Sequence, residues 1–288
     1  MAKVIIMADS NSGITPREAA EAGVDVLAMP VLVNGREYSE NVDLTHDDFF
    51  AMLEKNAEVS TSQPAPGTLM DRWGSLLQEY DEVVYIPMSS GLSNSCQSAT
   101  LFANDFGGRV HVVDNHRISV TQKQSVYRAK KLADEGKTGA EIKKILEDEA
   151  FEAHIYIALD DLSCLKKGGR LTPAVATIGT LLQIKPVLKI EGYKLDVASK
   201  TRGMKQARRT MIKLMQENID TDMKALVDSG RAQLYMAYSD VPQDVIDGWT
   251  EEIKAAFPGF DLYVDRLTLS VCCHTGAGAI GIGISEKW

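Results

Sequence analysis

Two segments of this 288-residue chain concentrate hydroxyl side chains where neither a helix nor a strand requires them. The first is T-S-Q-P-A-P-G at 61–67, in which Thr61 and Ser62 precede two prolines and a glycine that stiffen a loop. The second is M-S-S-G-L-S-N-S at 88–95, which includes Ser93. Hydroxyl groups donate hydrogen bonds without carrying a charge. Two such loops could therefore hold a small anion such as a carboxylate.

Two further polar segments flank predicted strands. The segment A-D-S-N-S at 8–12 follows the first strand and contains Ser10, and V-C-C-H-T-G-A-G at 271–278 precedes the last strand and offers His274 and Thr275. In an open α/β sheet, the loops at the carboxyl ends of the strands meet at the ligand crevice. Loops that enter helices add free N–H groups and the positive end of a dipole. Together the four segments predict a carboxylate site.

Each of these residues also has a simpler interpretation. Thr61 and Ser93 could be helix N-caps, a common role for threonine and serine, and His274 could be a core histidine. A hydrolase triad of Ser93, His274 and Asp9 can be assembled, because triads occur in several chain orders. The nucleophile motif G-x-S-x-G is nevertheless absent, since Ser95 occupies the position of its second glycine.

Other motifs give no support for a nucleotide, a metal ion or any cofactor. The string G-A-G-A-I-G at 276–281 matches G-x-G-x-x-G, but the chain given continues for only seven residues beyond it. A dinucleotide site needs a following helix and an acidic residue about 20 positions on. The chain contains neither a P-loop motif nor an H-E-x-x-H motif, and its four cysteines form no C-x-x-C pair. We expect the cysteines to be packing residues.

Composition indicates an ordinary globular protein. The 31 basic and 40 acidic residues leave a net charge of -9, which argues against a nucleic-acid partner. The apolar run before Asp9 is too short for a signal peptide, and no stretch approaches the roughly 18 apolar residues of a membrane span. We therefore expect a cytoplasmic protein with no stable membrane insertion.

The first half of the chain alternates short β-branched runs with amphipathic segments. Thr45 should cap a helix over 45–56, with Asp48 at the third position. Further helices are expected over 16–22, after Ser93, over 121–135 and over 139–150, and strands over 4–7, 26–33, 83–87 and 110–113. This alternation predicts a mostly parallel sheet with flanking helices.

The second half has a different pattern. We expect a strand over 155–159, a segment at 162–183 with a basic, glycine-containing loop followed by helix, and a hairpin over 186–197 turning at Glu191–Gly192. Helix, strand (233–238), helix, strand (262–265) and a final strand (279–284) complete the chain. The prediction is two α/β domains, 1–157 with a mostly parallel sheet and 158–288 with a mixed sheet and helices.

The motifs, taken in order, resemble those of the DegV family. The resemblance covers the whole chain and depends on Asp9–Ser10, 61–67, 89–93 with 97–99, L-K-K-G-G-R-L at 165–171, L-L-Q-I-K-P-V-L at 181–188 and H-T-G-A-G at 274–278. The chain has S-G-L-S-N-S where the family often has S-G-L-S-G-T, and H-T-G-A-G where it has H-x-G-P-G.

The resemblance implies a specific role for several residues. In the family's fatty-acid-binding (FakB-type) members, the residues that match Thr61, Ser93 and His274 bind the fatty-acid carboxylate. Arg170 and Arg202 match arginines near the head-group opening, which are implicated in acyl-phosphate handling or kinase docking. Lys167 belongs to the same basic segment, which could instead be a solvated helix end. Ser10, Ser62 and Thr275 are additional ligand-binding candidates.

The resemblance also implies a function. It predicts a protein without catalytic residues of its own that buries the tail of a long-chain fatty acid in an apolar tunnel. The head group would lie between the two domains, where a separate ATP-dependent fatty-acid kinase would phosphorylate it for phospholipid metabolism. The alternatives are a lipid or ester hydrolase that uses Ser93 and His274, and a carrier of another amphipathic carboxylate.

Overall fold

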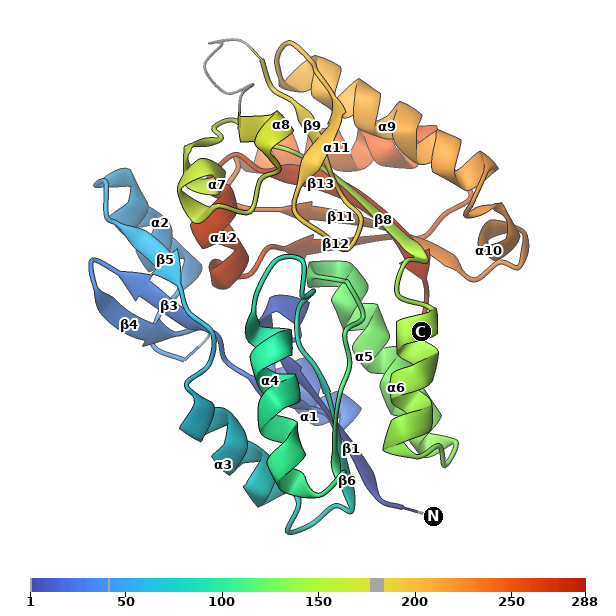
Figure 1. Ribbon diagram of the computed structural model, residues 1–288. Coiled ribbons are helices and arrows are strands. Elements are labelled where there is room, and N and C mark those ends of the chain that lie inside the picture. The colour runs from blue at the N-terminus through green and yellow to red at the C-terminus, as the bar shows by residue number, and fades with distance from the viewer. Residues whose placement is uncertain (1, 41, 177–183) are drawn as a thin grey trace. The chain divides into compact units, whose positions relative to one another are not determined.

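The computed structural model describes residues 2–40, 42–176 and 184–288, which form two compact units. Unit 1 is the chain up to Phe151 with Thr268–Ser270 and Trp288, and unit 2 is Glu152–Leu267 with Val271–Lys287. Each unit combines a sheet with helices, so the predicted α/β fold class is confirmed (Figure 1). The predicted domains 1–157 and 158–288, with a head group between them, stay a prediction.

The main sheet of unit 1 has four parallel strands in the order β2-β1-β6-β7. These strands are β2 (Asp25–Leu27), β1 (Val4–Asp9), β6 (Glu82–Ile86) and β7 (Val110–Val112). The helices of this part are α1 (Pro16–Ala22), α3 (Pro66–Leu76), α4 (Ser95–Ala103), α5 (Ser119–Asp134) and α6 (Gly139–Asp148), with the 3-10 turns η1 (Ser10–Ser12) and η2 (Asn104–Phe106).

Strand alternation explains why helices cover both faces of this sheet. On β1, Ile6 and Ala8 pack into one core with residues of α1, α5 and α6. Ile5 and Met7 point the other way, into a core with α3 and α4. Because successive side chains of a strand face opposite sides, a run that is apolar throughout is buried on both faces.

A small antiparallel sheet, in the order β4-β3-β5, also belongs to unit 1. Its strands are β3 (Pro30–Val33), β4 (Arg36–Ser39) and β5 (Val59–Thr61), and α2 (His46–Glu54) lies between β4 and β5 in the sequence. Thr45 caps α2 by accepting a hydrogen bond from Asp48 N, as predicted. The single extended run expected over 26–33 was wrong: it divides before Pro30 into β2 and β3, which belong to different sheets.

Unit 2 contains a six-stranded mixed sheet in the order β10-β9-β8-β13-β11-β12, in which only β11 and β12 pair in parallel. The strands are β8 (Ala153–Ala158), β9 (Val187–Ile190), β10 (Asp196–Ser199), β11 (Ala232–Tyr238), β12 (Leu262–Arg266) and β13 (Ile280–Glu286). The long helices are α9 (Met204–Asp220) and α11 (Gln243–Ala256), and α10 (Lys224–Asp228) is short. The predicted hairpin is confirmed as β9 and β10.

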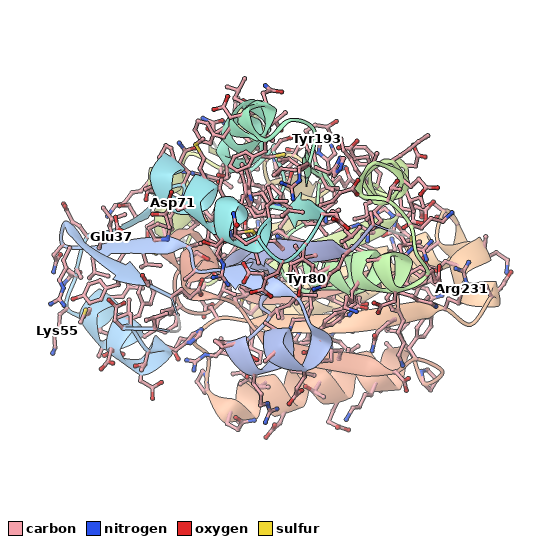
Figure 2. The ribbon with its side chains drawn as sticks, turned by 90° about the horizontal axis from the view of Figure 1, so that it is seen from below. Glu37, Lys55, Asp71, Tyr80, Tyr193 and Arg231 are labelled. Atoms are coloured by element: carbon pink, nitrogen blue, oxygen red, sulfur yellow. The ribbon has the colours of Figure 1, made fainter. Side chains whose placement is uncertain are left out.

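The core of unit 2 lies between one face of this sheet and the long helices. Ile280, Ile282 and Ile284 of β13 pack there, together with Met211 of α9 and Trp249 of α11. Charged side chains of both units project outward, including exposed Glu37, Lys55, Asp71 and Arg231 (Figure 2).

Two predicted loops are helical. The basic segment forms α7 (Ser163–Gly168), which is followed by α8 (Pro173–Ala176), and 271–275 lie in α12 (Leu269–Thr275). The helix expected in the second half of 162–183 lies, from 177 onward, outside the described residues. Short helices are hard to predict because seven residues or fewer show less than two periods of the helical pattern.

Candidate ligand site

Thr61 and Ser62 stand at the end of β5. Thr61 is half-buried as the last residue of that strand, where it pairs with Val31, and Ser62 is exposed in the following loop. The N-cap of α3 is Ala65, so the helix-capping interpretation of Thr61 was wrong. Gln63 of the same loop accepts a hydrogen bond from Ser98 Oγ of α4 at 2.9 Å, which connects the two hydroxyl-rich segments within unit 1.

Ser93 lies just before α4 and remains half-buried. Its Oγ accepts a hydrogen bond from Ser95 N at 3.1 Å and lies 2.6 Å from Ser95 Oγ. The N-cap residue of α4 is Asn94, which makes no side-chain cap. Ser93 therefore satisfies one N–H of the first helical turn from the position before the cap.

Asp9 is the buried centre of the strand ends in unit 1. Its carboxylate accepts hydrogen bonds from Asn11 N at 3.1 Å, from Met88 N at 2.8 Å and from the Gln122 side-chain amide at 3.1 Å. Burial raises the pKa of Asp9, and these hydrogen bonds partly oppose that effect. Because Asp9 joins the loop after β1 to the loop after β6, it positions the segment that carries Ser93.

Ser10 is buried and already engaged within unit 1. Its Oγ donates to Glu40 Oε2 at 2.6 Å and accepts from Met29 N at 3.0 Å. Glu40 is 1% exposed and also accepts from Ser270 Oγ at 3.1 Å and from Leu269 N. Burial raises the pKa of Glu40 to about 7 in spite of these donors. Glu40 was not identified from the sequence, because the residue type alone does not show whether a glutamate is buried.

His274 is in the last turn of α12, in unit 2, where the H-T-G-A-G segment packs against α7. A methyl group on Gly168 would collide with His274 Nδ1, so the ring lies directly on the backbone of α7. Burial, with a smaller contribution from the positive charge of Arg170, lowers the pKa of His274 to about 4. The imidazole is therefore neutral at pH 7, and a neutral ring presents one N–H donor.

The same packing continues through the rest of the segment. A side chain on Gly276 would contact Cys164 Sγ at 3.2 Å, and one on Gly278 would meet the Asp160 side chain at 2.7 Å. Thr275 between them is 4% exposed. Tertiary structure thus brings the segments 160–168 and 274–278 together, over a hundred residues apart in the sequence.

The predicted basic residues have different environments. Arg170 is half-buried and donates to Gly168 O, while Lys167 is exposed in the last turn of α7. Arg202 is exposed, and its backbone N–H donates to Gln206 Oε1 at 2.8 Å. Lys167 and Arg202 are therefore accessible to a partner.

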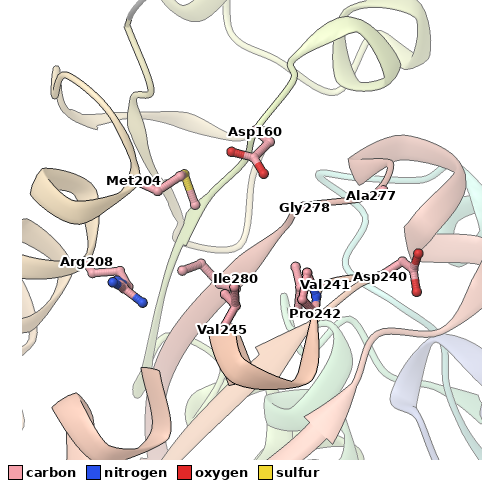
Figure 3. A pocket seen from close by; sticks show the side chains of 10 residues that line it. All are labelled: Asp160, Met204, Arg208, Asp240, Val241, Pro242, Val245, Ala277, Gly278 and Ile280. Carbon is pink, nitrogen blue, oxygen red and sulfur yellow. The ribbon is translucent and has the colours of Figure 1, made fainter. Parts of the chain in front are cut away.

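A pocket of about 420 Å³ opens in unit 2 beside Gly278 (Figure 3). Apolar side chains dominate its lining, with three charged residues beside them: Met204, Val241, Pro242, Val245, Ala277, Gly278 and Ile280, and Asp160, Arg208 and Asp240. Its volume falls within the range of roughly 300–1,000 Å³ that is usual for small-molecule sites. Sequence reasoning missed these residues, since they come from four separate stretches of the chain.

Within residues 2–40, 42–176 and 184–288, no group of three or more His, Cys, Asp or Glu side chains could hold a metal ion. In the same residues, no helix is both long enough and apolar enough to cross a bilayer.

Known proteins resemble this chain along its whole length. A DegV domain-containing protein of Deinococcus radiodurans is 30% identical, with 98% of each chain aligned. A DegV family protein of Thermus thermophilus, solved for its fatty-acid binding, is 29% identical with a TM-score of 0.86 over 99% of both chains. The fatty-acid-binding DegV of Bacillus subtilis is 26% identical with a TM-score of 0.84 over both complete chains. The sequence model of the DegV family, described as an uncharacterised protein family, matches residues 3–287, and this chain therefore belongs to the DegV family.

Proposed function

We propose that this protein binds a long-chain fatty acid and presents its carboxylate to a separate fatty-acid kinase. The observation that carries the first part is the full-length likeness to fatty-acid-binding DegV structures, at TM-scores of 0.86 and 0.84. The head-group ligands in this proposal are Thr61, Ser93 and His274, with Ser62 and Thr275 beside them. Ser10 belongs to the supporting network, because both of its hydrogen bonds are internal.

The chemistry of the three ligands suits an ionised carboxylate. Two hydroxyl groups and a neutral imidazole donate hydrogen bonds, and a buried carboxylate is costly unless it receives them. The low pKa of His274, about 4, supports a neutral donor. When a carboxylate binds beside the ring, the negative charge should raise that pKa.

The hydrocarbon tail supplies most of the affinity in this proposal. About 15 methylenes buried at about 0.8 kcal/mol each give roughly 12 kcal/mol of gross transfer free energy. Loss of translational and conformational freedom removes several kcal/mol of that gain. The apolar pocket beside Gly278 is our candidate entrance for the tail, since Met204, Val245 and Ile280 line it.

The proposed interaction with a kinase is supported by the positive charge of one segment of the chain. Residues 162–216 contain twelve Lys and Arg and only two acidic residues, in a chain whose net charge is -9. A basic segment attracts phosphate groups and acidic protein surfaces. It includes Lys167, Arg170 and Arg202, which we propose face the partner or the transferred phosphate.

Mass spectrometry of small molecules extracted from the denatured, purified protein tests the binding proposal. A stoichiometric free fatty acid is the expected result. An empty protein that hydrolyses a chromogenic acyl ester would instead indicate the hydrolase, and a different extracted carboxylate would indicate another carrier. Val245→Trp should fill the pocket and reduce the retained fatty acid, while Gln243→Trp, exposed on the same helix, should not.

Kinase-coupled assays test the head group and the basic residues. Thr61→Ala with Ser93→Ala should weaken kinase-dependent phosphorylation more than it weakens lipid retention, because the tail dominates affinity. Arg170→Ala should leave fatty-acid binding intact and slow the coupled reaction. An unchanged coupled rate would assign Arg170 to ordinary surface.

A further inference from the structure

Ser93 and Ser95 form a hydroxyl pair at the start of α4, entirely within unit 1. The two Oγ atoms are 2.6 Å apart, and Ser95 N donates to Ser93 Oγ at 3.1 Å. Ser95 is 3% exposed, whereas Ser93 is half-buried. One member of the pair is therefore enclosed by the protein and the other can still meet a ligand.

The number of protons and lone pairs decides the direction of the bond between them. A hydroxyl group has one proton and accepts two hydrogen bonds. Among the residues that the structure describes, the Ser95 hydroxyl makes a hydrogen bond with Ser93 Oγ and with no other side-chain or backbone acceptor. If Ser93 donated to Ser95, the buried Ser95 proton would have no acceptor, which costs about 1–3 kcal/mol. Ser95 therefore donates.

This direction has a consequence for Ser93. Its two lone pairs accept from Ser95 N–H and from Ser95 O–H, which leaves only its own proton for another partner. A hydroxyl in that state is a donor and no longer an acceptor. Hydrogen bonds in such a chain also polarise one another, so Ser93 becomes a stronger donor.

We propose that Ser95 is a positioning residue, which commits the Ser93 hydroxyl to donating toward a group that only accepts hydrogen bonds, such as an ionised carboxylate. The inference deepens the proposed fatty-acid function and rests on it. Ser95 does not touch the ligand in this scheme, and it acts only through Ser93.

The pKa of the bound ligand's own carboxyl group reports this effect directly. Donors to the ionised form lower that pKa, so losing them raises it. The experiment follows the carboxyl resonance of a [1-¹³C] C16 saturated fatty acid, bound to the full-length protein, by ¹³C NMR across a pH titration. Ser93→Ala should raise the ligand pKa, by an amount on the order of 0.5–1 unit. Ser95→Ala should raise it by a fraction of that.

The double variant distinguishes positioning from a merely structural role. If Ser95 acts through Ser93, then Ser95→Ala adds no further shift in the Ser93→Ala background. Ser95→Thr keeps the hydroxyl and should restore the wild-type ligand pKa. Thr100→Ala, at an exposed position on α4 where the hydroxyl donates to Cys96 O, should leave it unchanged.

The outcomes separate the two proposals. A shift for Ser93→Ala with none for Ser95→Ala, or equal shifts from Ser95→Ala with and without Ser93, overturns the role of Ser95 and leaves the fatty-acid site intact. No shift for Ser93→Ala overturns the assignment of Ser93 to the head group and the inference with it. No bound resonance at all overturns the proposed fatty-acid binding itself.

Discussion

In unit 1 two buried carboxylates, Asp9 and Glu40, hold neighbouring segments together by hydrogen bonds, whereas in unit 2 His274 is held by close packing on a glycine. Asp9 and Glu40 accept six hydrogen bonds between them, from donors in several separate segments of unit 1. His274 lies against Gly168 beside the positive charge of Arg170. Hydrogen bonds therefore position the segments around Asp9 and Glu40 in unit 1, and steric contact positions the His274 ring in unit 2.

The two arrangements also depend on pH in opposite directions. A carboxyl whose pKa is raised by folding makes the protein less stable as pH increases. An imidazole whose pKa is lowered makes it less stable as pH decreases. The pKa of Glu40 rises from 4.5 to about 7 on folding, so the loss of stability it causes falls between pH 4.5 and 7. The pKa of His274 falls from 6.5 to about 4, so the loss of stability it causes falls between pH 6.5 and 4. The two effects overlap, so single variants are needed to separate them.

The largest expected effect is at Asp9. Asp9→Ala removes the acceptor of three hydrogen bonds, two of them buried and one half-buried, and the free energy of unfolding should fall by about 3 kcal/mol or more. Asp114→Ala is the comparison variant, because Asp114 accepts a hydrogen bond from Ser90 N and lies 3.6 Å from His116 Nε2. Its substitution should lower the free energy of unfolding by about 1 kcal/mol. Urea denaturation at pH 7 measures both. Equal losses would show that the number of hydrogen bonds to Asp9 does not matter.

Glu40→Gln tests the pH dependence assigned to unit 1. In the folded protein Glu40 keeps its proton up to about pH 7, and in the unfolded chain it loses it near pH 4.5. The folded state binds more protons in this window, so wild-type stability should fall relative to the variant as pH rises through it, by up to about 3 kcal/mol. Denaturation curves for both proteins between pH 4 and 8 check this. Parallel pH profiles would contradict a buried, titrating Glu40.

A smaller effect is expected in unit 2. Gly168→Ala places a methyl group against His274 Nδ1, and the overpacking should cost about 1–3 kcal/mol and displace the ring. The matched control is Gly169→Ala: the residue has a φ of +69° but nothing within 4 Å, so it should cost roughly 1 kcal/mol without moving His274. Thermal unfolding and the His274 Cε1–H resonance separate the two effects. If both variants shift that resonance equally, close packing does not hold the ring.

Most of the regular elements could be predicted because their patterns repeat over enough residues. The apolar run of β1 and the cap at Thr45 are local features, and both are confirmed. The run 26–33 was misread because an unbroken apolar stretch does not show which sheet each half joins. The segment around His274 was misread because seven residues are too few for a helical period to be recognised.

The sequence by itself determined the α/β class, the order of the elements and membership of the DegV family, because these depend on periodicity and on motifs along the chain. Only the tertiary structure decided that Glu40 is buried, that His274 is neutral and that the Ser95 hydroxyl is hydrogen-bonded to Ser93 Oγ. Protonation and hydrogen-bond direction depend on the groups that fold around an atom. Those groups come from distant parts of the chain, so no local pattern records them.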